Sequence, residues 1–223
     1  MPAFDTAALI RSYELYTNEL NVELDALQHI IVAAGEPLEG NSFYGHQTLQ
    51  LYPALFTKQV NLFWCGQEAK TRLCEIGFNA GHSALLFLIG RQSSPVEMTV
   101  FDIGEHRYTK PCLSHIKSRF PLARIEYVEG DSTATMPAWI ERNAAAVGSY
   151  DVVHVDGGHT EHCITNDMKN ADRLVRPGGL VIVDDTNCAH INRCADSYIA
   201  SGSYTEVEVL KTQGYQHRIL RKV

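Results

Sequence analysis

The spacing of apolar residues along the chain changes character near Arg72. Before this point, apolar side chains recur at steps of three and four residues, which is the period of an amphipathic helix. They are Leu9, Tyr13, Tyr16, Leu20, Leu24, Leu27 and Ile31. The pattern predicts a helix over residues 4–34, with Asp5 or Thr6 capping its start and Gly35 ending it.

A second helix is predicted over residues 47–62, bent near Pro53 because proline lacks a backbone N–H. Residues 40–45 between the two helices are predicted to form a loop. We expect residues 1–45 to form a helical extension that covers the site as a lid, and residues 46–223 to form the main domain.

After Arg72, short apolar runs alternate with helical segments. Strands are predicted over residues 72–76, 98–102, 125–129, 152–155 and 180–183, with helices over residues 81–90, 110–119, 134–147 and 161–175. This alternation implies right-handed crossovers and a parallel sheet covered on both faces, an α/β, doubly wound, Rossmann-like fold. Pro177-Gly178-Gly179 predicts a turn before the fifth strand.

The end of the chain departs from this alternation. A helix predicted over residues 190–200 is followed by two strand-like runs, residues 205–210 and 216–221. Their link, residues 211–214, is short enough only for a hairpin. The last pair of strands is therefore predicted to be antiparallel.

Acidic side chains stand where four of the predicted strands end. They are Glu75, Asp102, Asp156 and the pair Asp184 and Asp185. The carboxyl ends of parallel strands line one crevice, and ligands bind there in open α/β sheets. We therefore expect these carboxylates to meet at one edge, where they can bind hydroxyls, amines or a cation.

The first of these ends runs into a glycine turn that opens the next helix. Gly77 and Gly81 allow a tight turn and the close approach of a ligand, and the helix N-terminus supplies N–H groups for a carboxylate or phosphate. Ser83 adds a hydroxyl. Asn79 interrupts the G-x-G-x-x-G spacing of dinucleotide sites. The charge of Glu75 suits the amino group of S-adenosylmethionine better than a pyrophosphate, so we expect S-adenosylmethionine as the cofactor.

Two more strand ends, with Asp156, complete the predicted cofactor site. Asp102 stands about 25 residues beyond Gly77, where an acid receives ribose hydroxyls. Asp131, followed by Ser132, is placed to meet an adenine. These acids can instead be helix N-caps, an interpretation that fits Asp131 in particular. Because these acids stand at successive strand ends, the set as a whole favours cofactor binding over helix capping.

Five segments, in order, resemble the motifs of class I S-adenosylmethionine-dependent methyltransferases. They are EIGFNAGHSA, VFDIG, EGDS, YDVVHVDGGHT and LVRPGGLVIVDDTN. Within that class they are similar to the small metal-dependent O-methyltransferases of the catechol and caffeoyl-CoA type and to their bacterial natural-product relatives, over residues 45–223. The resemblance implies a seven-stranded sheet in the order 3-2-1-4-5-7-6 with strand 7 antiparallel, which agrees with the hairpin.

Asp156, Asp184 and Asp185 end neighbouring strands, which lie about 4.8 Å apart, so their carboxylates can converge on one ion. Hard oxygen ligands favour Mg²⁺, with Ca²⁺ or Mn²⁺ as substitutes. The resemblance implies that these three positions hold a divalent cation. The acids can instead cap a helix and shape a turn. Three carboxylates repel one another without a cation, however, and this favours a metal.

His159 follows Asp156 by three residues, at a position where the resembled families place a lysine base. An imidazole accepts a proton near neutral pH, so we expect His159 to deprotonate a hydroxyl of a small acceptor during methyl transfer. His159 can also be only a neighbour of the following helix start. Three other functions stay open: an N- or O-methyltransferase without metal, a nicotinamide-dependent oxidoreductase, and a non-catalytic nucleoside-binding protein.

The composition of the chain limits which kinds of partner we expect it to bind. A chain of 223 residues with 45% hydrophobic and 20% charged residues fits one α/β domain, and a net charge of −7 without a basic run argues against nucleic acid. No apolar run has the length of a membrane span, no signal peptide is recognisable, and the six cysteines form no C-x-x-C pair. We expect a cytoplasmic protein with free thiols that does not bind membranes. Its N-terminal helices offer a surface for a homodimer, which the sequence does not decide.

Overall fold

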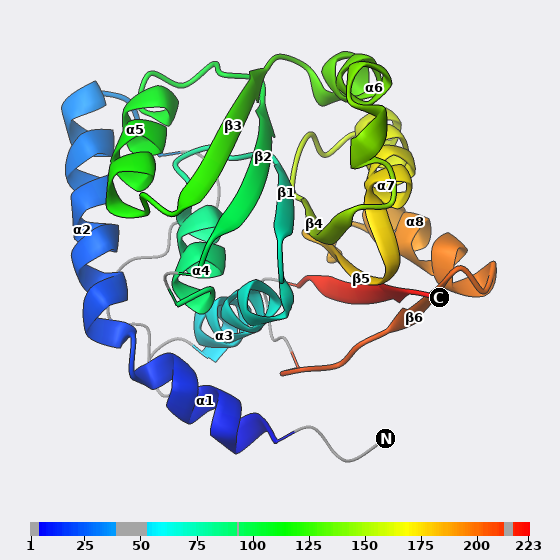
Figure 1. Cartoon of the computed structure of the whole chain (residues 1–223), viewed down its shortest axis with the longest axis horizontal. Coiled ribbons are helices and arrows are strands. Elements are labelled where there is room, and N and C mark those ends of the chain that lie inside the picture. Colours follow the sequence, from blue (N-terminus) through cyan, green and yellow to red (C-terminus); the bar gives the residue numbers. More distant parts are fainter. Residues whose placement is uncertain (1–4, 39–52, 93, 212–215) are drawn as a thin grey trace.

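The computed structural model describes residues 5–38, 53–92, 94–211 and 216–223 (Figure 1). Its centre is a seven-stranded sheet in the order β3-β2-β1-β4-β5-β7-β6. The strands are β1 (Arg72–Ile76), β2 (Val96–Asp102), β3 (Ala123–Glu129), β4 (Tyr150–Val155), β5 (Val175–Val183), β6 (Tyr204–Glu206) and β7 (Arg218–Lys222). Strand β7 runs antiparallel to both β5 and β6, while β1 to β5 are parallel. The predicted fold class and strand order are confirmed.

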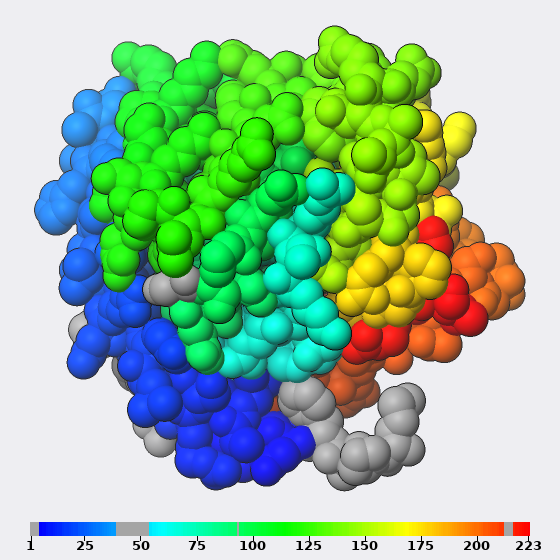
Figure 2. Space-filling model, in the orientation of Figure 1, coloured from blue at the N-terminus to red at the C-terminus, as the bar shows by residue number. Residues whose placement is uncertain are grey.

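Helices cover both faces of this sheet. One face is covered by α3 (Pro53–Glu68), α4 (His82–Gly90) and α5 (Thr109–Arg119), with α1 (Thr6–Glu14) on α3 and α2 (Thr17–Ala34) on α4 and α5. The other face is covered by α6 (Ser132–Arg142), the 3₁₀ turn η1 (Ala144–Ala146), α7 (Glu161–Leu174) and α8 (Ala189–Ala200). Side chains alternate between the two faces along a strand, and helices bury both faces. The central strands are therefore mostly apolar on both faces. Figure 2 shows the N-terminal helices, in blue, continuous with the green surface of α5.

The helix predicted over residues 4–34 is two helices, α1 and α2, that meet near Tyr16. Tyr13 and Tyr16 both pack on Phe63, with ring centroids 5.5 and 5.7 Å away, so the chain turns around this ring. The predicted caps are confirmed. Asp5 Oδ1 accepts a hydrogen bond from the Ala8 N–H at 2.9 Å, and Gly35 ends α2 with a φ of 71°.

In the described residues, α3 begins at Pro53 and continues to Glu68, beyond the predicted end at residue 62. Proline is tolerated at the first turn of a helix, and the bend predicted near Pro53 involves residues that the structure does not describe. Residues 47–52, the predicted lid loop at residues 40–45 and the domain boundary at residue 45 lie outside the described residues. So do residues 212–215, which include most of the predicted hairpin link at residues 211–214.

The turn predicted at Pro177-Gly178-Gly179 is wrong, because these residues lie inside β5. The pairing of β4 with β5 shifts from Tyr150 opposite Val175 to Val152 opposite Leu180, so the extra residues form a bulge. Strand β6 is also shorter than predicted. It ends at Glu206, and beyond it Leu210 exchanges two hydrogen bonds with Asn61 of α3, at 2.9 and 3.0 Å. No helix within the described residues is long and apolar enough to cross a bilayer.

Gly77, at the end of β1, lies against the backbone at the end of β4. It has a φ of 88°, and a Cβ at this position would stand 1.9 Å from the carbonyl oxygen of Asp156. Backbone cannot move away as a flexible side chain can. Glycine is therefore required here by the junction of two strands, whatever ligand the turn binds.

We expect Gly77→Ala to lower the free energy of unfolding by at least about 3 kcal/mol or to prevent folding. Gly35→Ala is the matched control. It also places a side chain at positive φ (71°) but meets no atom within 4 Å, so it should cost only about 1 kcal/mol of left-handed strain. Urea unfolding followed by circular dichroism measures both. Equal losses of unfolding free energy in the two variants would show that the close approach of Gly77 to Asp156 does not contribute.

Candidate functional site

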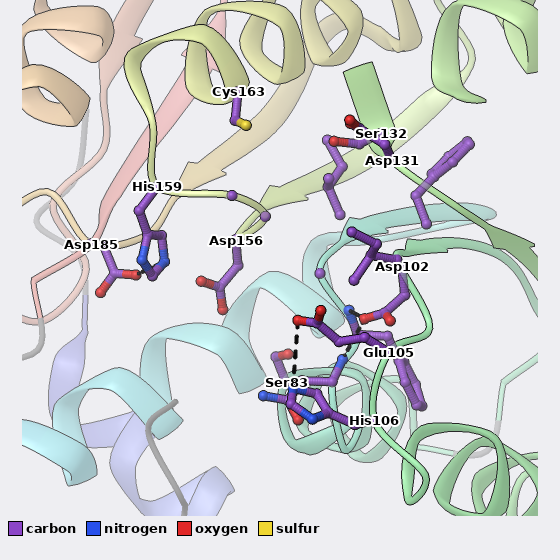
Figure 3. Close-up of a pocket in the computed structure, with 18 of the residues that line it drawn as sticks. Ser83, Asp102, Glu105, His106, Asp131, Ser132, Asp156, His159, Cys163 and Asp185 are labelled. Atoms are coloured by element: carbon purple, nitrogen blue, oxygen red, sulfur yellow. Dashed lines mark hydrogen bonds and ion pairs between the residues drawn. The ribbon is translucent and has the colours of Figure 1, made fainter. Parts of the chain in front are cut away.

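A cavity of about 590 Å³ lies at the carboxyl ends of β1 to β4. Its wall comes from the glycine turn after β1, the loop after β2, the start of α6 and the turn after β4. Figure 3 shows Asp102 and Asp131 on one side, Asp185 and His159 on the other, and Asp156 between them. The volume lies within the range of small-molecule sites. The strand ends thus form the crevice that was predicted for them.

Most of the predicted site residues line this cavity. They are Gly77, Asn79, Ser83, Asp102, Asp131, Ser132, Asp156, His159 and Asp185. Glu75, Gly81 and Asp184 are not part of its wall. Gly81 serves packing, because a Cβ there would stand 2.5 Å from side-chain atoms of both Phe78 and Ile116.

Glu75 is fully buried on the sheet face that α3 and α4 cover. Its Oε1 accepts a hydrogen bond from the Ser83 hydroxyl and lies 3.2 Å from His154 Nδ1. Glu75 and His154 are register partners on β1 and β4, which places their side chains next to each other. Burial lowers the pKa of His154, but Glu75, Asp156 and Asp184 together outweigh it and raise that pKa. The pair supports the cavity wall from behind, through Ser83.

The carboxylate of Asp102 holds the glycine turn in place. Its Oδ2 accepts hydrogen bonds from the N–H groups of Phe78 and Asn79, both at 2.8 Å, and its Oδ1 accepts one from Gly104 at 2.7 Å. Both oxygens therefore already have backbone partners, although Asp102 still lines the cavity. Glu105, a second acid after β2 that the sequence analysis did not single out, also lines it, and its side chain is 62% exposed.

Asp131 is the N-cap of α6, as the alternative interpretation of the sequence proposed. Its Oδ1 accepts hydrogen bonds from the backbone N–H and the hydroxyl of Thr133, at 2.9 and 2.8 Å. These hydrogen bonds lower the pKa of Asp131. The side chain is exposed and lies at the cavity wall beside Ser132, so the capping role leaves it within reach of a ligand.

Asp156, His159 and Asp185 form the other end of the cavity. His159 Nε2 lies 2.9 Å from Asp185 Oδ2, and one ligand atom from each of the three residues lies within 4.8 Å of the others. The His159 carbonyl lies 2.6 Å from His190 Nε2. Two carboxylates and an imidazole in such a group form a donor set that suits a divalent cation. Of the three predicted metal ligands, Asp156 and Asp185 lie in this group, together with His159.

Asp184 is not a member of this group and lies in the sheet interior. Its side chain is 2% exposed and forms a salt bridge through Oδ2 with Lys58 of α3, whose side chain is 3% exposed. Its Oδ1 accepts a hydrogen bond from the Asp185 N–H at 3.0 Å. Asp184 also shares a second group with His154 and Asp156, with ligand atoms within 4.8 Å of one another.

Lys58 changes the charge balance at this edge. Burial raises the pKa of Asp184, but Lys58 and His154 outweigh it and lower that pKa to about 2. Burial and the charge of Asp184 raise the pKa of Asp156 well above its usual range. The carboxylates therefore do repel one another, as predicted, but a buried ammonium already offsets part of the repulsion. The sequence offers one signal for this lysine, which is the only charged residue between Pro53 and Gln67.

Residues 74–186, half of the chain, match the profile of a methyltransferase domain family. The chain belongs to this family. None of the curated proteins compared with the sequence matches it. Among solved structures, the methyltransferase is similar to the O-methyltransferase from Bacillus cereus in complex with SAH, at 18% identity, a TM-score of 0.64 and coverage of 91% of both chains.

Two further solved structures are similar to this methyltransferase. One is the O-methyltransferase TomG from Streptomyces achromogenes in complex with SAM, at 18% identity, a TM-score of 0.60 and coverage of 90% of this chain and 89% of that one. The other is CalS11, a TDP-rhamnose 3'-O-methyltransferase, at 16% identity, a TM-score of 0.58 and coverage of 89% and 92%. Such low identities show a common fold. Together with the family, they confirm a class I S-adenosylmethionine-dependent methyltransferase.

Asp167 of α7 lies beneath the turn that carries Asp156. The residue is buried, and a Cβ on Gly157 would stand 2.8 Å from Asp167 Oδ2. Burial raises the pKa of Asp167 to about 6, and the neighbouring Ser132 opposes this only in part. In the unfolded chain the pKa of the same carboxyl is near its ordinary value of 3.8. Between these two pH values the folded state holds a proton that the unfolded state has released.

Stability should consequently fall as the pH rises from about 4 to about 6, because the unfolded state deprotonates first. Asp167→Asn cannot ionise, so the variant should lose this decline and exceed the wild type at pH 7.5 by up to about 3 kcal/mol. Urea unfolding at pH 4 and pH 7.5 measures the difference, with the exposed Asp25→Asn as control. A constant difference between variant and wild type at both pH values would contradict the raised pKa.

Proposed function

We propose that this methyltransferase transfers a methyl group from S-adenosylmethionine to a hydroxyl oxygen of a small acceptor, with a divalent cation at the acidic edge. One observation carries the proposal. Asp156, His159 and Asp185 form a compact polar group at one end of the same cavity whose other end is built on the glycine turn and Asp102 (Figure 3). A cofactor and an acceptor in this cavity would therefore meet near Asp156.

The residues around the glycine turn fit the cofactor. The N-terminus of α4 has no side-chain cap, so its N–H groups can receive the carboxylate of the amino acid part. Ser83 adds a hydroxyl at the same wall. Because Asp102 is occupied by three backbone N–H groups, we assign the ribose hydroxyls to the exposed carboxylate of Glu105 together with Asp102. When bound, S-adenosylmethionine supplies a methyl group on a positively charged sulfur.

The opposite end fits an acceptor and an ion. If bound there, a divalent cation would supply Lewis acidity that lowers the pKa of a coordinated hydroxyl. Asp156 and Asp185 are placed to hold the cation, which leaves room for water and the acceptor, as Mg²⁺ usually requires. Asp185 orients the His159 imidazole through the 2.9 Å contact, and His159 takes the hydroxyl proton. The bond from methyl carbon to sulfur breaks as its bond to oxygen forms.

The structural neighbours support a hydroxyl acceptor, since their names describe O-methyltransferases, and that of CalS11 describes methylation of a sugar nucleotide. The family argues against the nicotinamide-dependent alternative. Methyl transfer without a metal is the principal competing proposal, because Lys58 already offsets part of the acidic charge. We expect an intracellular enzyme acting on a small molecule.

Binding and turnover can be measured separately. We expect S-adenosylhomocysteine to bind in calorimetry with or without Mg²⁺. We expect methyl transfer from labelled S-adenosylmethionine to catechols or sugar nucleotides to require the ion and to stop when a chelator is added. Turnover that persists in the presence of a chelator would contradict the proposed role of the metal, but not the methyltransferase activity itself. Absence of S-adenosylhomocysteine binding would overturn the cofactor site.

His159→Ala should lower kcat by about a hundredfold or more, the usual contribution of a positioned base. Binding of S-adenosylhomocysteine should stay unchanged, because His159 lies at the far end of the cavity from the glycine turn (Figure 3). The exposed His162→Ala, in the first turn of α7, is the control. If His159→Ala also lowers Mn²⁺ affinity more than tenfold in calorimetry, His159 is an ion ligand and another group is the base.

A further inference from the structure

Asp184 and Asp185 are consecutive in sequence but face different surroundings. Ile182 packs in the core beneath α3 and α4, and strand alternation gives Asp184, two residues later, the same side. There it meets Lys58 of α3. Asp185 has a φ of 52°, which ends the strand geometry and brings its side chain to the cavity wall. The backbone therefore separates the two carboxylates.

The partners of Asp184 occupy both of its oxygens. Oδ2 carries the salt bridge with Lys58 and lies 3.9 Å from His154 Nε2, while Oδ1 accepts the Asp185 N–H. Asp184 is 3% exposed and is absent from the cavity wall, whereas Lys58, Asp156 and Asp185 belong to it. An ion entering from the cavity thus meets the Lys58 side chain and two other carboxylates before it can reach Asp184.

We propose that Lys58 withdraws Asp184 from the ion site, so that a divalent cation is held by Asp156 and Asp185, with His159 at hand, and not by three carboxylates. The inference rests on the proposed cation site and concerns which residues of this chain form it. For the ion to bind Asp184, a buried ammonium would have to leave its carboxylate or share it with a second positive charge. Either change is unfavourable, since a buried charge without a partner costs more than the pair.

Lys58 also affects how tightly the site binds a divalent cation. Burial alone would lower the pKa of Lys58, but Asp184, Asp156 and Asp185 together raise it, so its ammonium lies within electrostatic reach of all three carboxylates. A fixed positive charge at this distance repels an incoming cation. The wild-type site should consequently bind a divalent ion more weakly than a site in which Asp184 is free, and Lys58 is a positioning residue whose removal should tighten binding.

Calorimetric titration with Mn²⁺ tests the ligand set directly, without turnover. We expect Asp185→Asn to weaken Mn²⁺ binding at least tenfold and Asp184→Asn to weaken it by a smaller factor, because only the unpaired charge of Lys58 then opposes the ion. Lys58→Met should tighten it at least fivefold, because Asp184 becomes free to join the ion. The exposed Lys70→Met removes the same charge away from the site and is the control.

Asp184→Asn leaves Lys58 buried without its partner and can impair folding. The double variant Lys58→Met with Asp184→Asn removes both charges and should return Mn²⁺ affinity to within threefold of the wild type. A loss in Asp184→Asn, or in this double variant, as large as that in Asp185→Asn would overturn the inference. So would unchanged or weaker binding in Lys58→Met. If the wild-type protein binds S-adenosylhomocysteine but no Mn²⁺, the cation part of the proposed function is wrong, and this inference is wrong with it.

Discussion

The salt bridge between Lys58 and Asp184 decides how negative charge is distributed at the carboxyl edge of the sheet. Parallel strands bring several carboxylates to one edge, and without buried cations their repulsion would oppose folding. In this chain the inner acids face basic partners within the core, Asp184 with Lys58 and Glu75 with His154. The outer acids, Asp156 and Asp185, are left at the cavity wall. The chemistry of the cavity follows from this division between buried and lining carboxylates.

The two halves of the cavity share one piece of backbone. The Asp156 N–H donates to the Ile76 carbonyl at 2.9 Å, and the Asp156 carbonyl leaves no room for a side chain on Gly77. Asp102 then fixes the rest of the glycine turn through its N–H groups. The turn at the cofactor end therefore cannot shift without moving Asp156 at the acceptor end. Methyl transfer depends on such fixed positions, because the reacting atoms must be held close and in line.

Periodicity and strand ends predicted most of this arrangement. The change of apolar spacing near Arg72 separated helices from β-α units, and the rule that ligands bind at strand ends located nine cavity-lining residues in advance. The failures have physical causes that lie outside local sequence. The break before α2 follows from the packing of Tyr13 and Tyr16 on one distant ring. The pairing of Asp184 with Lys58 was not foreseen because the two residues lie 126 positions apart in the chain. A strict count of strand alternation from Ile182 would have separated Asp184 from Asp185.

The position of Lys58 also indicates a role for the N-terminal helices other than the predicted lid. They were predicted as a lid, but in the described residues before β1 only Lys58 lines the cavity. The neighbouring Gln59 accepts a hydrogen bond from the Tyr13 hydroxyl at 2.7 Å, and Tyr13 packs on Phe56 and Phe63 of the same helix. Helix α1 thus fixes α3 on both sides of Lys58. Since the ammonium must reach a single buried carboxylate, this packing couples α1, remote from the cavity, to the charge at its acidic end.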